Sequence, residues 1–325
     1  MICYRIPKGK KFCYQDKNQN TITDKNFVQY IKSLVIPPAW TNVEINSSPR
    51  AKICATGYDL KGRKQYLYNA KFRAKQEAYK FDHLLEFGNQ VHAMRQTTSL
   101  HLRKRKLDRE KVLATMLKLI ETAYFRPGNE LYTKQNKSFG LTTLQKKHLT
   151  VKGDHLTFEY LGKSGKMQQK QIANRSLAKI VKQLSEIPGK EIFKFIDEND
   201  NIRNVKPKHL NQYIHEVMGN GFSAKNFRTW GGSVMASQYL DEVGIVEGKN
   251  QKILKRNIKE AVTSVSEKLG NTPAIARKSY IDPRVFKNYE KGKILSDFKK
   301  DAKKLSKKHH ELSDAERAFL CMMRK

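Results

Sequence analysis

The segment LGNTPAIARKSY ends at Tyr280, a tyrosine whose neighbours suit attack on a phosphodiester. A phenol with a reference pKa of about 10 is a modest nucleophile, so such a site needs cations that favour the phenolate and stabilise a pentacoordinate transition state. Arginine suits this task because its guanidinium is always charged and matches phosphate geometry. A lysine near the phosphate would donate the proton that the leaving oxygen requires.

Three basic residues stand in local sequence that would hold them in place. Arg126 follows an apolar helical pattern and precedes a Pro-Gly break, Arg228 lies between two aromatic residues in NFRTWGG, and Lys163 lies in the turn LGKSGK. The glycines of that turn would allow close approach to a backbone phosphate. Taken singly, Arg126 could be a helix-terminal charge, Lys163 a turn lysine and Tyr280 a core aromatic. All four residues occur together in one chain, and each stands beside packing or turn residues. This combination favours the catalytic interpretation.

The charge of the chain indicates a polyanionic partner. Its 325 residues include 64 Lys and Arg but only 31 Asp and Glu, which gives a formal net charge of +33. An excess of this size repels itself in the folded state, and nucleic acid relieves it because each neutralised phosphate releases counterions. A membrane is the weaker expectation, since no stretch approaches the roughly 20 apolar residues of a spanning helix.

The N-terminal segment and the cysteines favour an intracellular protein. The segment MICYRIPKGKKFCYQDK has no apolar run followed by a small-residue cleavage site, so no secretory signal is expected. Cys3, Cys13, Cys54 and Cys321 form no C-x-x-C pair, so neither a zinc site nor a disulfide framework is expected. We therefore predict free thiols in a reducing compartment, and no bound metal.

The hydrophobic pattern divides the chain into two parts. Residues 1–77 read as short strands and turns, with VIPPAW extended and two strand-like runs around a DLKG turn. Helical spacing of apolar residues then dominates, interrupted by a three-stranded island between 148 and 172. We expect an α+β protein with a small β-rich N-terminal domain, residues 1–77, and a larger, mainly α-helical domain containing a small β-sheet, residues 78–325.

Two local patterns add detail to this division. Tyr66 and Tyr68 are two residues apart, so they share one face of a strand while Gln65 points the other way. Near the C-terminus, Ser313 and Glu316 have capping-box spacing. The preceding segment KILSDFKKDAKKLSKKHH predicts a lysine-rich amphipathic helix, which is either a solvated face or a contact to the DNA backbone.

Six segments resemble those of the small type IB DNA topoisomerases of poxviruses, other large DNA viruses and bacteria. The resemblance runs in collinear order from about Ile36 to Tyr280 and covers most of the chain. The segments are IPPAW, GRKQYLY, YFRPG, LGKSGK, KNFRTWGG and LGNTPAIARKSY.

The resemblance implies both a fold and an activity. The fold would be that of the type IB topoisomerases and tyrosine recombinases. In the family, a tyrosine attacks one strand of double-stranded DNA, forms a 3′-phosphotyrosyl bond and frees a 5′-hydroxyl, which reseals the strand after rotation. Neither ATP, a metal nor another cofactor is needed. A monomer in nucleoid-associated cytoplasm, or in a virus particle or viral factory, is implied.

The resemblance also assigns roles. Tyr280 would be the nucleophile, Arg126 and Arg228 would stabilise the transition state, and Lys163 would protonate the leaving oxygen. Asn271 stands nine residues before the tyrosine, where poxvirus members have His in a Gly-His-Thr-Pro setting. Its amide can donate a hydrogen bond to a non-bridging oxygen but carries no charge, so a general-acid role at this position is in doubt. In this respect the chain resembles the bacterial members.

DNA contacts are implied in both domains, which would form a clamp around the duplex. Gln65, Tyr66 and Tyr68 match positions that face the groove and backbone, where an amide reads a base edge and hydroxyls bind phosphate. The alternative is that the two tyrosines form an exposed face without a ligand. Tyr132 and Lys225 match backbone-contacting positions.

Two other functions are alternatives to the topoisomerase. A tyrosine site-specific recombinase shares the same chemistry, but recombinases usually have His-x-x-Arg where this chain has Lys225 before Arg228, and their N-terminal domain is typically helical. A non-catalytic DNA-binding protein would keep the charge without reason to keep the four catalytic residues. Denaturing electrophoresis separates this binding protein from the two enzymes, because only an enzyme traps DNA covalently.

Overall fold

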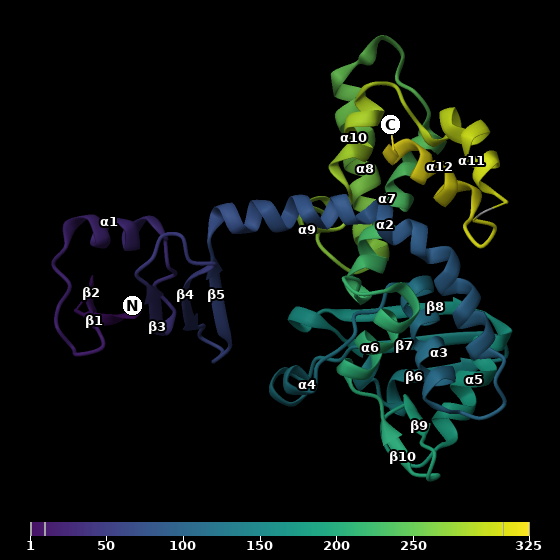
Figure 1. Ribbon diagram of the computed structural model, residues 1–325, viewed down its shortest axis with the longest axis horizontal. Helices are drawn as coiled ribbons and strands as arrows, with labels where there is room; N and C mark the ends of the chain where they lie inside the picture. Colours follow the sequence, from purple (N-terminus) through teal and green to yellow (C-terminus); the bar gives the residue numbers. More distant parts are fainter. Residues whose placement is uncertain (1, 10, 308, 325) are drawn as a thin grey trace. The chain divides into compact units, whose positions relative to one another are not determined.

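An antiparallel sheet of five strands forms most of the N-terminal unit. The structure is a computed structural model that describes residues 2–9, 11–307 and 309–324, and the chain divides into two units, Met1–Asp82 and His83–Lys325. The sheet has the order β2-β1-β3-β4-β5. Its strands are β1 (Ile2–Lys8), β2 (Lys11–Gln15), β3 (Thr41–Asn46), β4 (Ile53–Tyr58) and β5 (Lys64–Tyr68) (Figure 1).

One helix, α1 (Lys25–Ser33), lies between β2 and β3 in the chain, where the sequence indicated only strands and turns. It begins at Asp24, whose carboxylate accepts a hydrogen bond of 2.8 Å from the backbone N–H of Phe27 and so satisfies one of the free donors of the first turn. Ile31, one turn further on, is buried in the small core of this unit. The capping bond at Asp24 and the burial of Ile31, one turn after Phe27, explain why this segment is helical.

The IPPAW segment forms a turn that a buried arginine holds. Trp40 donates its backbone N–H to the carbonyl of Pro37, and its ring packs against the core of the N-terminal unit. The guanidinium of Arg5, 7% exposed, donates to the carbonyls of Pro37 (3.1 Å) and Trp40 (2.6 Å). The prediction of a non-helical segment with an aromatic anchor is confirmed.

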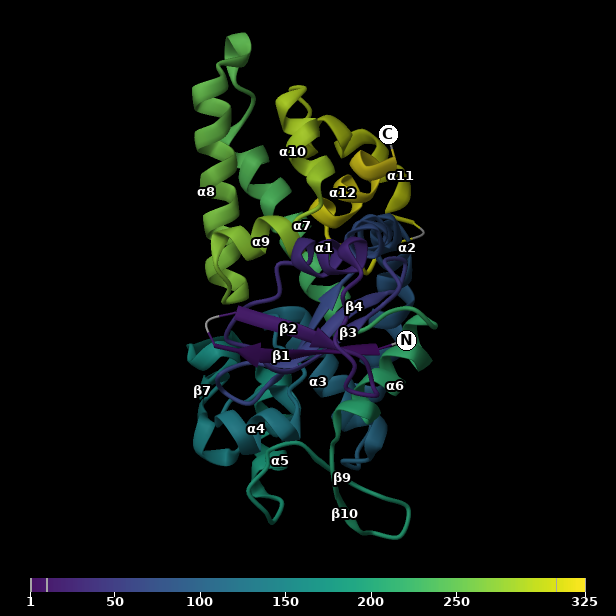
Figure 2. The same cartoon turned by 90° about the vertical axis from the view of Figure 1, so that its left-hand side faces the viewer.

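Helices make up most of the second unit, and the first of them, α2 (Ala70–Leu102), begins in the N-terminal unit. Figures 1 and 2 place α8 and α10 at one end of the second unit and α5 toward the other. The remaining helices are α3 (Arg109–Ala123), α4 (Glu130–Asn136), α5 (Arg175–Glu186), α6 (Pro207–Met218), α7 (Ala224–Val243), α8 (Gln251–Leu269), α9 (Pro273–Ser279), α10 (Pro283–Glu290), α11 (Lys299–Leu305) and α12 (Asp314–Arg324).

Two small antiparallel sheets accompany these helices. The predicted three-stranded island is confirmed as β6 (Leu149–Lys152), β7 (His155–Leu161) and β8 (Met167–Ala173), in the order β6-β7-β8. A second hairpin, β9 (Lys194–Ile196) and β10 (Ile202–Asn204), was not predicted. Its strands have only three residues each, and its turn depends on Asp197, whose carboxylate accepts hydrogen bonds from the backbone N–H groups of Asn199 and Asn201. The mixed α+β class is confirmed.

Helix α3 lies at the centre of the second unit. Val112 to Leu117 are all buried, and the helix packs against α5, α6, α7 and β8. A helix that is buried on nearly every side belongs to a core rather than a surface. The residues that follow its C-terminus are therefore anchored by extensive apolar packing.

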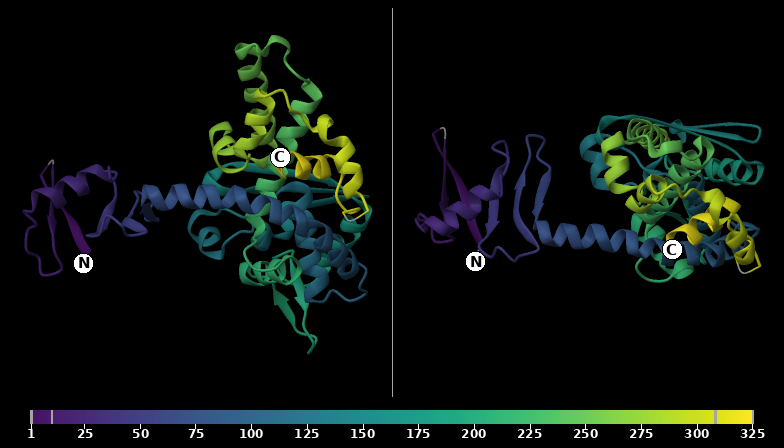
Figure 3. Two further views of the ribbon diagram at one scale, coloured as in Figure 1. Left: turned by 45° about the horizontal axis from the view of Figure 1, so that its top comes forward. Right: turned by 90° about the horizontal axis from the view of Figure 1, so that it is seen from above.

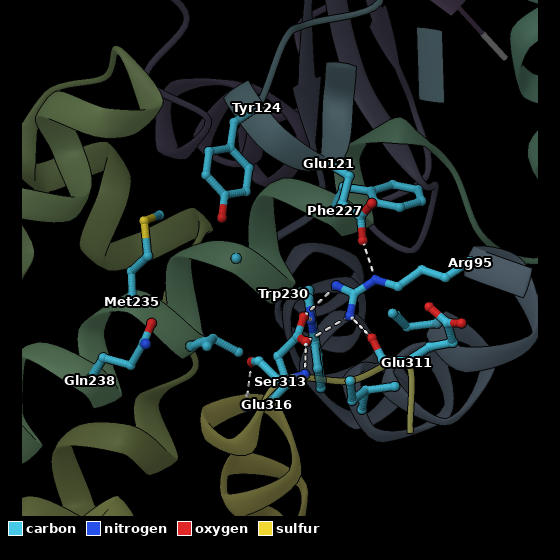
Figure 4. A pocket seen from close by; sticks show the side chains of 14 residues that line it. Arg95, Glu121, Tyr124, Phe227, Trp230, Met235, Gln238, Glu311, Ser313 and Glu316 are labelled. Carbon is cyan, nitrogen blue, oxygen red and sulfur yellow. Dashed lines mark hydrogen bonds and ion pairs between the residues drawn. The ribbon is translucent and has the colours of Figure 1, made fainter. Parts of the chain in front are cut away.

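The C-terminal helix α12 is joined to α2 and α7 by a buried ion pair. Glu316 forms two hydrogen bonds with the guanidinium of Arg95, 2.7 and 2.8 Å long, and accepts another of 3.0 Å from the indole of Trp230 (Figure 4). It also accepts from the backbone N–H of Ser313 at 2.8 Å, which confirms the predicted capping box. Figure 3 shows the C-terminal segment, in yellow, beside the green helices.

The lysine-rich segment before α12 is only partly helical. A short 3₁₀ turn, Leu295–Phe298, precedes the seven-residue α11. Leu295, Phe298 and Ala302 are buried, so this segment is amphipathic as expected.

In the described part of the chain, no helix has the combined length and apolarity of a membrane span. Nor do three His, Cys, Asp or Glu side chains in those residues gather as a metal site would require. The four cysteines are free.

We predict that Glu316→Gln lowers the free energy of unfolding by about 2 kcal/mol at pH 7, because it replaces charge-assisted hydrogen bonds from Arg95 with weaker neutral ones, while Glu121 still neutralises the Arg95 charge. Burial by itself raises the pKa of Glu316, but its hydrogen bonds with Arg95 outweigh this and hold the pKa below its usual 4.5. The stabilisation is therefore complete above about pH 4.5 and is lost as the pH falls through the lowered pKa.

Urea unfolding followed by Trp230 fluorescence, in a Trp40→Phe background, measures this difference. Glu186→Gln, at an exposed position, is the matched control and should change stability by less than about 0.5 kcal/mol. Equal stabilities of the Glu316→Gln variant and its parent at pH 7 would contradict the prediction.

Candidate active site

The C-terminal turn of α8 presents backbone carbonyls to a cluster of basic side chains. The helix ends at Gly270, which has φ +62° and ψ 48° in the left-handed region. A Cβ on this residue would lie 2.2 Å from Oε1 of Gln168, so both the backbone conformation and the available space require glycine. The last carbonyls of a helix have no partner within it and carry the negative end of its dipole.

Three consecutive carbonyls of this turn each accept a hydrogen bond from a different basic side chain. The three donors come from β8, from α7 and from the loop after α3, so the end of one helix collects cations from three elements. The pairs are Lys170 Nζ with Lys268 O (2.8 Å), Arg228 Nη2 with Leu269 O (2.8 Å) and Arg126 Nη2 with Gly270 O (3.4 Å).

Arg126 is held in place through its backbone and its side chain. Helix α3 ends at Tyr124, which adopts a left-handed conformation at φ 56°. Two residues later, the carbonyl of Arg126 accepts a hydrogen bond of 2.8 Å from the N–H of Leu141. The guanidinium also donates to the side-chain oxygen of Asn271. The arginine that the sequence placed after an apolar helix therefore reaches the end of α8.

Arg228 lies in the first half of α7 and is 2% exposed. Besides its bond to Leu269, its Nη1 donates to the carbonyl of Tyr124, a residue whose side chain is labelled in Figure 4. Burial, and next the nearby charge of Arg126, lower the pKa of this guanidinium. An arginine remains charged even so, so the interior of the site carries a fixed positive charge.

Tyr280 follows the last residue of α9 and packs under Arg228. The guanidinium carbon of Arg228 lies 4.8 Å from the centroid of the tyrosine ring. A Cβ on Gly232 of α7 would lie 2.5 Å from the Tyr280 carbonyl oxygen, so α7 and the tyrosine backbone are in close contact. Burial by itself raises the pKa of Tyr280, but the charge of Arg228 and its hydrogen bond with the phenol, together with the charges of Arg126 and Lys225, outweigh it and bring the pKa below 10.

Two buried donors at this cluster have no hydrogen-bond partner among the described residues. They are Nε of Arg228 and Nδ2 of Asn271. Buried N–H groups are nearly always paired, so an unpaired one suggests a ligand or an ion that completes it. An anionic oxygen at either donor would satisfy it and would be attracted by Arg126 and Arg228.

Lys163 is placed differently from the other predicted catalytic residues. It is exposed, in the 3₁₀ turn Lys163–Gly165 between β7 and β8. Ser164 and Gly165 have positive φ angles of 66° and 71°, as a tight turn requires. The structure therefore brings Tyr280, Arg126, Arg228 and Asn271 together but leaves Lys163 on the loop, without a hydrogen bond to any of these four described residues.

Two further residues of the second unit, Lys225 and Tyr132, were predicted to contact DNA. Lys225 is exposed in the first turn of α7, one turn before Arg228, and its charge helps to lower the pKa of Tyr280. The backbone of Tyr132 lies in α4, but its side chain lies outside the described residues.

The N-terminal candidates lie on β5 of the first unit. Tyr66 and Tyr68 are 47% and 39% exposed, and their rings stack with centroids 6.2 Å apart. The prediction that they share one face is confirmed. Gln65 is half-buried and donates its amide N–H to the carboxylate of Asp59 at 2.9 Å, so the amide is held by its own hairpin.

Lys170 was not predicted from the sequence. It lies on β8, where Gln168, Lys170 and Ile172 alternate as buried positions with exposed neighbours. Strand side chains point to opposite faces in turn, so every second residue of β8 faces the core. The signal in the sequence was that two of these core-facing positions, Gln168 and Lys170, hold polar residues.

Comparisons with known proteins agree with this fold and site. A family model described as "Eukaryotic DNA topoisomerase I, catalytic core" matches residues 69–309, and one described as "Bacterial DNA topoisomerase IB, N-terminal domain" matches residues 11–59. The chain is 34% identical over 283 residues to "DNA topoisomerase 1B" of Acanthamoeba polyphaga mimivirus, covering 86% of this chain and 84% of that relative.

A more distant viral relative extends this agreement. "DNA topoisomerase 1B" of Vaccinia virus (strain Copenhagen) is 23% identical over 285 residues, which cover 82% of this chain and 86% of the relative. The chain belongs to the type IB DNA topoisomerases, and the resemblance drawn from the six motifs is confirmed. Its substrate class is DNA.

We predict that Gly270→Ala reduces DNA cleavage by about 10- to 100-fold, because the new methyl group would displace Gln168 or the carbonyls that hold the cations. Gly153→Ala is the matched control: Gly153 has a similar φ of +55°, but no atom lies within 4 Å of its added Cβ. Both variants should lose about 1 kcal/mol of stability from backbone strain. Single-turnover cleavage of a duplex measures the difference, and equal cleavage rates in the two variants would contradict the prediction.

Proposed function

We propose that this topoisomerase relaxes supercoiled DNA with Tyr280 as its nucleophile. The observation that carries the proposal is the placement of the Tyr280 ring beneath the Arg228 guanidinium, in a cluster that holds two buried N–H donors without a partner among the described residues. A lowered phenol pKa increases the fraction of phenolate at neutral pH. The same positive charge would stabilise the phosphate as it gains a fifth oxygen ligand.

In the cleavage step, the phenol oxygen of Tyr280 attacks phosphorus while the bond from phosphorus to the 5′-oxygen breaks. The phenol proton is released, and the 5′-oxygen receives a proton as it leaves. Arg228, Arg126 and the amide of Asn271 bind the non-bridging oxygens on which negative charge develops. Each such donor is worth roughly 10²- to 10³-fold in rate. Resealing is the reverse reaction, with the 5′-hydroxyl as nucleophile.

Lys163 is the proposed donor of the proton to the 5′-oxygen. Its exposed turn, with two residues at positive φ, is a short segment between β7 and β8 that can contact bound DNA. The proposed role requires the loop to approach the scissile phosphate when DNA is present. An ammonium is suited to this task because it carries both the proton and a charge that attracts phosphate.

The phosphodiester that is broken and the phosphotyrosyl ester that is formed are bonds of the same kind. The energy of the broken phosphodiester bond is therefore kept in the covalent intermediate, and relaxation needs no ATP.

All the proposed catalytic side chains belong to one chain, which supports action as a monomer. An intracellular location, in nucleoid-associated cytoplasm or in a virus particle or viral factory, follows as part of this proposal.

The face of β5 is the proposed DNA contact of the N-terminal unit. Stacked, exposed tyrosines at positions 66 and 68 offer hydroxyl groups to phosphate. Gln65 would have to exchange its bond with Asp59 for a base edge. In the second unit, Lys225 at the start of α7 and Tyr132 on α4 are the proposed backbone contacts.

We predict that the wild-type protein relaxes both negatively and positively supercoiled plasmid in EDTA without ATP, and that Tyr280→Phe does not. The variant keeps the ring beneath Arg228 but lacks the attacking oxygen. Tyr239→Phe is the matched control, since it removes only a hydroxyl that bonds Glu260 at the surface, and it should retain full activity. If neither wild type nor Tyr280→Phe relaxes plasmid yet both bind it, a recombinase or a DNA-coating protein becomes the better assignment.

We predict that a substrate with sulfur in place of the bridging 5′-oxygen separates the roles of Lys163 and Arg228. A thiolate leaves without a proton because its pKa is low, so this substrate should restore cleavage by Lys163→Ala to within about tenfold of wild type. It should not restore Arg228→Ala, which lacks transition-state stabilisation. Lys166→Ala, at an exposed lysine in the same loop, is the control. No rescue of Lys163→Ala would contradict the proton-donor role.

A further inference from the structure

Lys170 is a buried lysine whose charged surroundings are unusual for a structural role. It is 9% exposed and lies opposite Phe158 in the β7–β8 ladder. Burying an ammonium is costly unless acceptors or an opposite charge compensate it. The charged groups that face it among the described residues are Arg228 from α7, Arg126 from the loop after α3 and Lys268 from α8, all of them cations.

The acceptor that Lys170 does have is at the end of α8. Its Nζ donates a hydrogen bond of 2.8 Å to the carbonyl of Lys268, the residue before the carbonyls that hold Arg228 and Arg126. Lys170 therefore fixes the same helical turn that orients both arginines. It also adds a positive charge to a cluster that already has two, and no carboxylate of the described residues offsets it.

Strand β8 links this turn to the loop that carries Lys163. The side chain of Gln168, two residues before Lys170, packs against Gly270, where a Cβ would meet its Oε1 at 2.2 Å. The same side chain packs against Gly162, where a Cβ would meet its Cγ at 2.6 Å. Gly162 immediately precedes Lys163, so one strand contacts both the end of α8 and the base of the proposed proton-donor loop.

We propose that Lys170, in its charged form, is a positioning residue for strand cleavage: it holds the C-terminal turn of α8 so that Arg228, Arg126 and Asn271 face the scissile phosphate, and it adds a third positive charge behind them. The inference rests on the proposed function of Tyr280. Lys170 lies outside the six motifs.

The charge of Lys170 responds to DNA. Burial, and next the charges of Arg228 and Arg126, lower the pKa of Lys170 to about 8. An anionic phosphate at the cluster favours the charged form and raises this pKa. At pH 8.5 the free protein therefore has Lys170 mostly neutral, and DNA binding takes up a fraction of a proton; at pH 6.5 Lys170 is charged in both states and takes up none.

The first test is single-turnover cleavage of a duplex by Lys170→Met, which keeps the length of the side chain without its charge. At pH 7 the rate constant for cleavage within the bound complex should fall by about 10- to 100-fold, and the Kd for DNA should rise by about three- to tenfold, because a charge whose pKa rises on DNA binding also contributes to that binding. Lys170→Arg, which keeps the charge, should recover most of the lost rate. Lys152→Met, at an exposed lysine of β6, should cleave as wild type does.

A second measurement does not depend on the cleavage step or on the folding of the methionine variant. Calorimetry of DNA binding in buffers of different ionisation enthalpy counts the protons taken up, using Tyr280→Phe as the parent to prevent cleavage. The parent should take up more protons at pH 8.5 than at pH 6.5, and Lys170→Arg in that background should lose this excess because arginine does not titrate there.

The outcomes separate the two proposals. Cleavage by Lys170→Met within twofold of wild type at pH 7, or an unchanged proton uptake in the Lys170→Arg variant, overturns the role of Lys170 and leaves Tyr280 as nucleophile. Loss of cleavage in Lys170→Met without any recovery in Lys170→Arg, together with no excess proton uptake by the parent, also overturns it. Failure of the wild-type protein to cleave any duplex overturns the proposed function itself.

Discussion

The carbonyl groups at the end of α8 hold together three cations that would otherwise repel each other. Lys268, Leu269 and Gly270 each present one carbonyl, and the donors come from three different elements. The negative end of the helix dipole adds to this attraction. Because the acceptors are neutral carbonyls rather than carboxylates, the cluster keeps its positive charge. A phosphate that enters such a site meets cations held only by neutral carbonyls and amide oxygen, and two N–H donors that no described residue pairs.

The rest of the second unit keeps those donors in place. Arg228 lies on α7, and two residues later on the same helix Trp230 donates to Glu316 of α12. The C-terminal helix therefore supports α7 through the Arg95–Glu316 ion pair, although it contributes no side chain to the site (Figure 4). Arg126 depends on the buried α3, and Lys170 on β8. Tyr280 itself is positioned by the short α9 and by the close approach of its carbonyl to Gly232.

The sequence predicted the parts of this structure that depend on local signals. The turns KGD and GKSGK set the three strands β6, β7 and β8, and the proline pair before Trp40 excluded a helix.

Helix α1 was missed because one cap at Asp24 and two or three apolar positions are a weak signal between strands. The β9–β10 hairpin was missed because its strands are only three residues long. Lys170 was missed because a lysine in a strand reads as exposed, and its burial depends on a helix about 100 residues later. The roles of Tyr280, Arg126, Lys163, Arg228 and Asn271 remain predictions.

The central claim is that this cluster activates Tyr280 for covalent attack on DNA. The most direct measurement is mass spectrometry of the trapped complex after nuclease and trypsin digestion. The account predicts a nucleotide 3′-phosphate mass on the tryptic peptide of residues 279–284, with fragment ions that place it on the tyrosine. A covalent adduct on any other residue, or complete relaxation activity without an adduct on this peptide, would contradict the account.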